Sequence, residues 1–148
     1  MKLIELKIRN FRGIRSLDLS LDVLTVLIGE NNTGKSTVLE AIRLVLTRGF
    51  GVRRGGQFTE YDFHLKDATA TPQTAEPISI TLHFAEEQEN EWPATIVQQV
   101  SEVIQLDTDG LNHIWLQAKG SYQSESGSFE TKWAFLNNSG VELNLRAF

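Results

Sequence analysis

Cysteine is absent from this chain of 148 residues, which excludes a disulfide framework, a thiol nucleophile and a zinc site with cysteine ligands. Long apolar runs are absent too, and a helix that crosses a membrane needs about 18 or more such residues. Charged side chains at Glu5, Lys7, Arg9 and Arg12 interrupt the stretch where an export signal would lie. We therefore expect a cytoplasmic protein that does not associate with membranes.

Basic side chains are scarce in the second half of the chain. Residues 1–66 contain 11 Lys and Arg against 7 Asp and Glu, whereas residues 67–148 contain 3 against 12. The basic first half suits a polyanion such as a nucleotide or DNA, although an unevenly charged solvated surface explains the counts equally well. The acidic second half argues against a surface there that wraps DNA.

The first 47 residues alternate in a way that predicts three strands and a helix. Apolar residues occupy every second position in residues 4–8 and 17–21, and the turn at Asn10–Gly13 between them indicates an antiparallel hairpin. The run at 23–28 is β-branched and nearly continuous, which is typical of a central strand buried on both faces. An apolar stripe between Lys35 and Thr47 predicts a helix, and its members are Val38, Leu39, Ile42, Val45 and Leu46.

The remaining chain is predicted to be a long loop at 48–77 followed by a β-rich part at 78–148. Alternation predicts a strand at residues 78–84, and an apolar stripe predicts a helix at about 93–104. Further strands are expected at 114–118, 129–135 and 141–145. We expect one α+β domain over residues 1–148 that contains one strand–loop–helix unit of the α/β type and a peripheral β-meander.

One motif carries a specific chemistry. Residues 29–36 read Gly-Glu-Asn-Asn-Thr-Gly-Lys-Ser and match the phosphate-binding pattern G-x-x-x-x-G-K-[ST] at every fixed position. The glycines let backbone N–H groups turn inward as an anion nest, Lys35 reaches the β- and γ-phosphates, and the Ser36 hydroxyl ligates Mg²⁺. The alternative is a glycine turn with a surface lysine. The predicted strand before the motif and helix after it favour the phosphate loop.

Other polar and aromatic residues have weaker interpretations. Arg12 either contacts a bound nucleotide or is merely an exposed turn residue, and the arginines of the long loop are either ligands of phosphate or DNA or solvated. We interpret Asp62 and His64 as a local turn in preference to residues that order the loop near a nucleotide. His83 and His113 lie in strands without neighbouring ligands, so a metal site is not expected there. The tryptophans are interpreted as core residues. The loop arginines are Arg48, Arg53 and Arg54, and the tryptophans are Trp92, Trp115 and Trp133.

The order of these segments resembles a known family. Residues 4–13 (IELKIRNFRG), the alternation at 17–21 and residues 26–37 (VLIGENNTGKST) look like the start of an ABC-type ATPase of the class shared by SMC, RecF and OLD (overcoming lysogenization defect) proteins. Residues 61–64 and the strand at 78–84 look most like OLD-family endonucleases, and the layout is similar to the ATPase half of the Gabija-type antiphage nuclease.

The resemblance implies the first lobe of a P-loop ABC-type ATPase, with a mixed sheet, one P-loop helix and an antiparallel β-meander arm. It implies that ATP and Mg²⁺ bind, with Arg12 as an accessory nucleotide contact and Ser36 as the metal ligand. The implied phosphate loop comprises Gly29, Asn31, Asn32, Thr33, Gly34, Lys35, Ser36 and Thr37.

The same resemblance indicates what is missing. No Walker B Asp-Glu pair, ABC signature, Q-loop glutamine, switch histidine or acidic Toprim cluster is identifiable, so we expect nucleotide binding without competent hydrolysis by this chain alone. Expected partners are a second copy or a further ATPase and Toprim region, with DNA bound through the parent protein. Two alternatives stay open: a RecF- or SMC-type repair ATPase head, and a non-enzymatic module that pairs with such a head.

Overall fold

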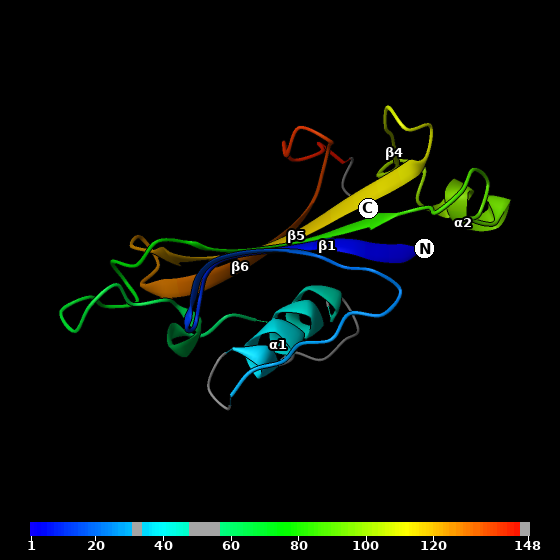
Figure 1. Ribbon diagram of the computed structural model, residues 1–148. Coiled ribbons are helices and arrows are strands. Elements are labelled where there is room, and N and C mark those ends of the chain that lie inside the picture. Colours follow the sequence, from blue (N-terminus) through cyan, green and yellow to red (C-terminus); the bar gives the residue numbers. More distant parts are fainter. Residues whose placement is uncertain (31–33, 48–56, 146–148) are drawn as a thin grey trace.

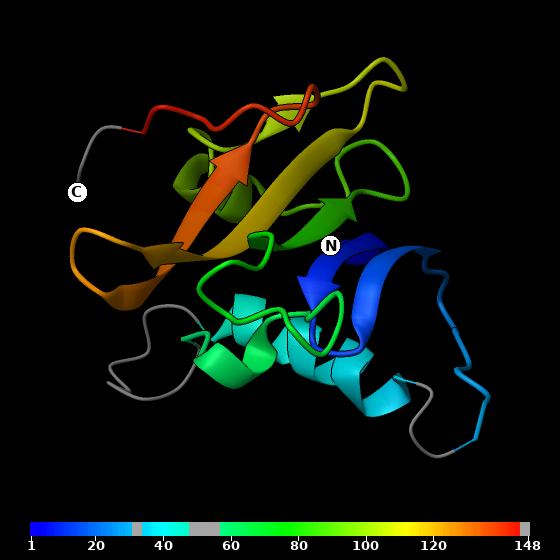
Figure 2. The same ribbon diagram turned by 90° about the vertical axis from the view of Figure 1, so that its left-hand side faces the viewer.

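The computed structural model describes residues 1–30, 34–47 and 57–145. Its architecture is α+β, with one antiparallel sheet and few helices (Figures 1 and 2). In chain order the elements are β1 (Lys2–Phe11), β2 (Ile14–Ser20), α1 (Lys35–Leu46), the 3-10 turn η1 (Glu60–Asp62), β3 (Ile78–Ala85), α2 (Ala94–Gln99), β4 (Gln105–Leu106), β5 (Asn112–Gln123) and β6 (Ser128–Leu136).

The sheet places distant parts of the chain next to one another. Its strand order is β2-β1-β3-β5-β4, and β6 pairs with β5. The predicted hairpin is confirmed, with Ile8 opposite Leu17, and on its other side Ile8 lies opposite Ile80 of β3. The β-rich second half is therefore not the peripheral arm that we expected, because β3 joins it directly to the N-terminal hairpin.

One face of the sheet is apolar and carries the helix. Leu6, Ile8, Ile80 and Leu82 are fully buried and belong to one cluster with the inner residues of α1. Alternate residues such as Glu5 and Lys7 point to the opposite face, as the period of a strand requires. Figure 1 shows the sheet edge-on with α1 beneath the apolar face.

Helix α1 lies where the sequence predicts it, but its buried face is rotated from the predicted stripe. Val38 and Val45 are buried as expected, together with Ala41 and Leu44. Leu39 and Leu46, which we assigned to the stripe, are exposed. The sheet covers only one side of the helix, so the two leucines at the margin of the stripe remain in solvent.

The predicted central strand at residues 23–28 is wrong, and so is the mixed sheet that depended on it. This segment has no strand structure, and Val23 and Ile28 are 82% and 91% exposed. Its hydrogen bonds are local, from Asp22 N to Thr25 Oγ1 and from Val23 N to Asp22 Oδ1. A central strand needs neighbours on both edges, and this segment has none in the described residues, where every strand pairing is antiparallel.

Two predicted elements of the C-terminal part are shorter than expected or absent. The predicted helix at 93–104 is helical only over α2, and the predicted strand at 141–145 is replaced by a single bridge between Leu136 and Glu142. Leu143 and Leu145 nevertheless pack against a second cluster around Trp92. The short strand β4 was not predicted. No helix within the described ranges combines the length and apolar character that crossing a membrane requires.

Candidate functional site

The start of α1 presents backbone N–H donors that have no partner within the helix itself. Gly34 precedes the helix with φ of 93°, a left-handed conformation that only glycine adopts readily. No side chain caps the helix, and its first turn contains no acidic residue. The first N–H groups of a helix have no partner within it and point outward with the positive end of the helix dipole. The local structure therefore favours an anion at this position.

Lys35 folds back toward the loop that precedes the helix. Its Nζ donates hydrogen bonds to the backbone carbonyls of Gly29 and Glu30, the latter at 3.2 Å. Ser36 is exposed, and Thr37 is half-buried. Asn31, Asn32 and Thr33 lie outside the described residues. The lysine cation is thus bound by two neutral acceptors, and a phosphate would replace them with a charged partner.

The turn between β1 and β2 lies beside this helix start. A methyl group at Gly34 would lie 3.8 Å from Cδ1 of Ile14, the first residue of β2. Arg12 occupies the same turn, and its Nη2 lies 4.0 Å from Oε1 of Glu40, which is on α1. The fold therefore brings Arg12 alongside the helix that begins with Lys35.

Two carboxylates flank the Arg12 guanidinium. Asp62 Oδ1 accepts a hydrogen bond of 2.8 Å from Arg12 Nε, and the Asp62 side chain is only 7% exposed. Glu40 is bound mainly by Arg43, which donates to it from Nε and Nη2. This hydrogen bonding lowers the pKa of Glu40 from its ordinary value, desolvation opposes the shift, and the charges of Arg43 and Arg12 add to it. The Arg12 side chain is 39% exposed, so one side of it remains open to solvent.

Asp62 and His64 form the local turn that the sequence predicts, and they also contact the hairpin. Thr59 and Asp62 make a reciprocal capping box around η1. In addition, His64 Nδ1 lies 2.7 Å from the Arg12 carbonyl oxygen and donates to it. The interpretation as a local turn was therefore incomplete. No signal in the sequence relates residues that lie 50 or more positions apart along the chain.

His83 and His113 are adjacent, although sequence reasoning gave neither a neighbour. Nε2 of His83 lies 2.8 Å from Nδ1 of His113, whose Nε2 contacts the Asp109 carboxylate at 3.0 Å. The ring of Trp115 stacks on His83 at 4.1 Å between centroids. Burial lowers the pKa of His83 from its ordinary value, and the charge of His113 lowers it further, while Glu5 acts against both. No cluster suited to a metal ion occurs in residues 1–30, 34–47 or 57–145.

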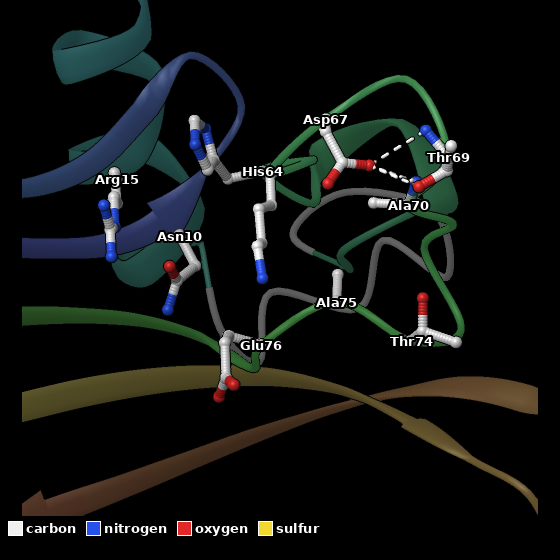
Figure 3. A pocket seen from close by; sticks show the side chains of 10 residues that line it. Asn10, Arg15, His64, Asp67, Thr69, Ala70, Thr74, Ala75 and Glu76 are labelled. Carbon is white, nitrogen blue, oxygen red and sulfur yellow. Dashed lines mark hydrogen bonds between the residues drawn. The ribbon is translucent and has the colours of Figure 1, made fainter.

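A pocket of about 560 Å³ lies between the hairpin and the loop at 66–76 (Figure 3). His64 and Asn10 lie on the hairpin side of this pocket, and the loop at 66–76 forms the opposite wall. The basic residues Arg15 and Lys66 line it together with the acidic residues Asp67 and Glu76. Asp67 already accepts hydrogen bonds from Thr69 and Ala70, which lower its pKa. Both signs of charge are present, so the pocket does not select an anion.

The remaining predicted residues divide into two groups. Trp92 is buried and Trp133 packs against the main core, as we interpreted them, whereas Trp115 stacks on the histidines. Arg48, Arg53 and Arg54 lie outside the described residues, so their interpretation as phosphate or DNA ligands stays a prediction.

Similarity to known proteins extends along the whole chain. Residues 1–148 match the model of the family described as "Protein of unknown function (DUF2813)". The chain is 38% identical over 79 residues to a protein named OLD nuclease from Thermus scotoductus, which is 53% of this chain and 14% of that protein. It is 26% identical over 133 residues to endonuclease GajA from Bacillus cereus, which is 90% of this chain and 22% of GajA. It is 30% identical over 145 residues to the uncharacterized protein YbjD from Escherichia coli, which is 98% of this chain and 25% of YbjD. The chain is thus related to OLD and GajA nucleases but spans at most a quarter of the length of these relatives.

Proposed function

Because the chain belongs to the DUF2813 family and α1 begins with a glycine-initiated, uncapped turn that carries Lys35, we propose that residues 29–37 bind the phosphates of Mg-ATP. The start of α1 carries this proposal. It offers the N–H groups of its first turn, the Lys35 cation and the exposed residue Ser36 within three consecutive residues. These are the groups that cradle a β- and γ-phosphate and its metal ion.

The residues present fit the ligand in charge and in hydrogen bonding. No acidic side chain competes with a phosphate in the first turn of α1. Within the part of the chain that the structure describes, the Ser36 hydroxyl forms no hydrogen bond, so it is available as a ligand of Mg²⁺. The metal ion would neutralise phosphate charge, Lys35 would bind the β- and γ-phosphates, and Arg12 would contact the nucleotide from the neighbouring turn.

The proposed whole is an ATP-dependent nuclease related to OLD proteins, of which this chain supplies the nucleotide-binding lobe. The exposed apolar segment at 23–28 supports this, because a β-branched run in solvent gains stability once neighbouring strands cover it. Further polypeptide, in the same protein or a second copy, would cover that segment and supply the Walker B acid for hydrolysis. A Toprim region would act on DNA.

The test is calorimetric titration of Mg-ATP into the 148-residue chain. We expect saturable binding that Lys35→Ala weakens more than tenfold, because a charge-assisted hydrogen bond contributes about 1.5–3 kcal/mol. Lys132→Ala is the matched control, since it removes the same charge from β6 and should leave the affinity unchanged. A folded wild-type chain without affinity for Mg-ATP would refute the proposal, as would equal binding by Lys35→Ala.

Steady hydrolysis is not proposed for this chain alone. If residues 1–148 turned over ATP continuously and Lys35→Ala abolished the turnover, the proposed dependence on further polypeptide would be wrong.

The second candidate function is a binding module that pairs with an intact ATPase head, and the exposed segment at 23–28 is the observation that favours it. This module would form a mixed complex with a full-length relative, detectable by size-exclusion chromatography. Val23→Asp, at the end of this segment farther along the chain from the phosphate loop, should abolish the complex while leaving the Mg-ATP affinity intact.

A further inference from the structure

Residues 62–64 are joined to the β1–β2 turn along their backbone. Arg12 N donates to the Asp62 carbonyl at 2.7 Å, and His64 N donates to the Asn10 carbonyl at 3.0 Å. Phe11 and Phe63 form an antiparallel bridge between these two hydrogen bonds. The segment after η1 is therefore a short edge partner of the hairpin end, even though about 50 residues of chain separate them. It fixes where the turn that bears Arg12 lies.

The two oxygens of the Asp62 carboxylate bind different partners. Its Oδ2 accepts hydrogen bonds from Thr59 N at 2.8 Å and from Thr59 Oγ1 at 3.3 Å, which completes the capping box. Its Oδ1 accepts the hydrogen bond from Arg12 Nε. Closing the local turn requires only Oδ2. Oδ1 is bound to Arg12, and a buried carboxylate with a single fixed cation partner restrains that partner tightly.

The way in which Arg12 is held leaves its outer edge available. A guanidinium has five N–H donors in one plane, and only Nε is used by Asp62. Nη2 faces α1 at 4.0 Å from Glu40, whose oxygens are already occupied by Arg43. The Arg12 side chain is 39% exposed, and its Cζ lies 4.9 Å above the Phe11 ring. The two Nη groups therefore form a fixed fork beside α1, which suits a phosphate.

The backbone at this turn is strained and is held in place. Asn10 and Arg12 have φ of 56° and 52°, in the left-handed region that disfavours residues other than glycine. The carbonyl of Arg12 is fixed by His64, and the carbonyl of Asn10 is fixed by the His64 N–H. Figure 3 shows His64 next to the hairpin at Asn10. Strain of this kind persists where surrounding contacts determine it, and it often accompanies a functional side chain.

We propose that Asp62 is the positioning residue for Arg12: it holds the guanidinium through Nε so that the Nη edge meets a phosphate of the nucleotide bound at the start of α1. This inference rests on the proposed function, since the phosphate belongs to Mg-ATP at Lys35. It assigns to the 57–64 segment the task of preorganising the site. Asp62 itself does not touch the ligand.

The test is a double-mutant cycle on the Mg-ATP dissociation constant of the 148-residue chain. We expect Arg12→Ala to raise it about tenfold or more, since charge-assisted hydrogen bonds contribute about 1.5–3 kcal/mol. Asp62→Asn, which places an N–H₂ group against either Arg12 Nε or Thr59 N, should raise it severalfold in the wild-type background. The same change should have no effect in the Arg12→Ala background.

Two further variants separate positioning from a structural role. Arg12→Lys retains a cation next to Asp62 but loses the planar fork, so we expect a melting temperature close to that of the wild type and a weakened affinity. Thr59→Ala breaks the side-chain part of the capping box but leaves the bond between Asp62 Oδ1 and Arg12 Nε, so it should leave the affinity unchanged. NMR of the wild type without nucleotide should show a slowly exchanging Arg12 Nε–H signal that Asp62→Asn abolishes.

The outcomes distinguish this inference from the proposed function. Binding that needs Lys35 but is unchanged by Asp62→Asn, or effects of Arg12→Ala and Asp62→Asn that simply add, would overturn the positioning role and leave the proposed function standing. A folded wild-type chain that binds no Mg-ATP would overturn both.

Discussion

Gly120 on β5 offers the sharpest test of the packing. A methyl group at this position would lie 2.6 Å from Cδ2 and 2.9 Å from Cγ of Phe58, well inside van der Waals contact. Phe58 is buried, its ring meets that of Phe11 edge-on at 5.9 Å, and its N–H donates to Thr131 Oγ1 at 2.9 Å. The missing side chain of Gly120 is therefore the space that the Phe58 ring occupies on the sheet.

Gly120→Ala should destabilise the chain by about 1–3 kcal/mol, because the ring is held on several sides and an inserted methyl group forces strained rotamers or a strand shift. At roughly 3 °C per kcal/mol for a domain of this size, the melting temperature should fall by about 3–9 °C. The assay is thermal unfolding followed by far-ultraviolet circular dichroism. The matched control is Gly13→Ala, because none of the described residues other than its chain neighbours has an atom within 4 Å of a new methyl group at Gly13. Its melting temperature should stay the same or rise slightly.

The cycle with Phe58→Leu identifies the cause. In that background the smaller side chain makes room, so Gly120→Ala should cost less than about 0.5 kcal/mol. If Gly120→Ala melted at the wild-type temperature, or cost as much with leucine at position 58 as with phenylalanine, the packing described here would be incorrect.

Three further perturbations test other features. Because the folded pKa of His83 lies below its unfolded value of about 6.5, the unfolded chain binds the proton first and stability should fall as the pH drops below about 7; the urea midpoint should decline less from pH 7.5 to 5.5 in His83→Gln than in the wild type. Leu44→Ala should cost about 2–5 kcal/mol and Leu39→Ala less than about 0.5 kcal/mol in urea unfolding, and equal costs would contradict the observed rotation of α1. Ile28→Ser should change the free energy of unfolding by less than about 0.5 kcal/mol while reducing concentration-dependent association in light scattering, whereas a loss of several kcal/mol would show that residue 28 is buried in solution.

The elements with local signals were predictable from the sequence. The alternation at 4–8 and 17–21 gave the hairpin, because the period of a strand places Leu6 and Ile8 on one face whatever lies beyond them. The helix from Lys35 was predictable because the spacing of apolar residues along a helix is also a local pattern. The phosphate loop stays a prediction from the motif, and the described geometry at Gly34 and Lys35 is compatible with it.

What failed depended on partners that a local pattern does not specify. The run at 23–28 reads as a buried strand, but burial requires neighbouring strands, and none lies beside it in the described residues. The contact between Arg12 and Asp62 joins residues 50 positions apart, and no local pattern at either residue predicts the contact. The pairing of His83 with His113 likewise arises from the register of β3 against β5, which places Ala85 opposite His113 and Trp115 opposite His83.

The pairing of β1 with β3 also determines when this domain can fold. Ile8 meets Ile80, so the central seam of the sheet closes only after β2, α1 and the long loop have all been synthesised. Contacts so distant in sequence slow folding, because the loop must close before they stabilise anything. Until then β1 presents an unpaired edge lined with apolar side chains, which is a template for intermolecular pairing. A nascent chain that has not yet reached residue 85 is therefore the species most prone to aggregate.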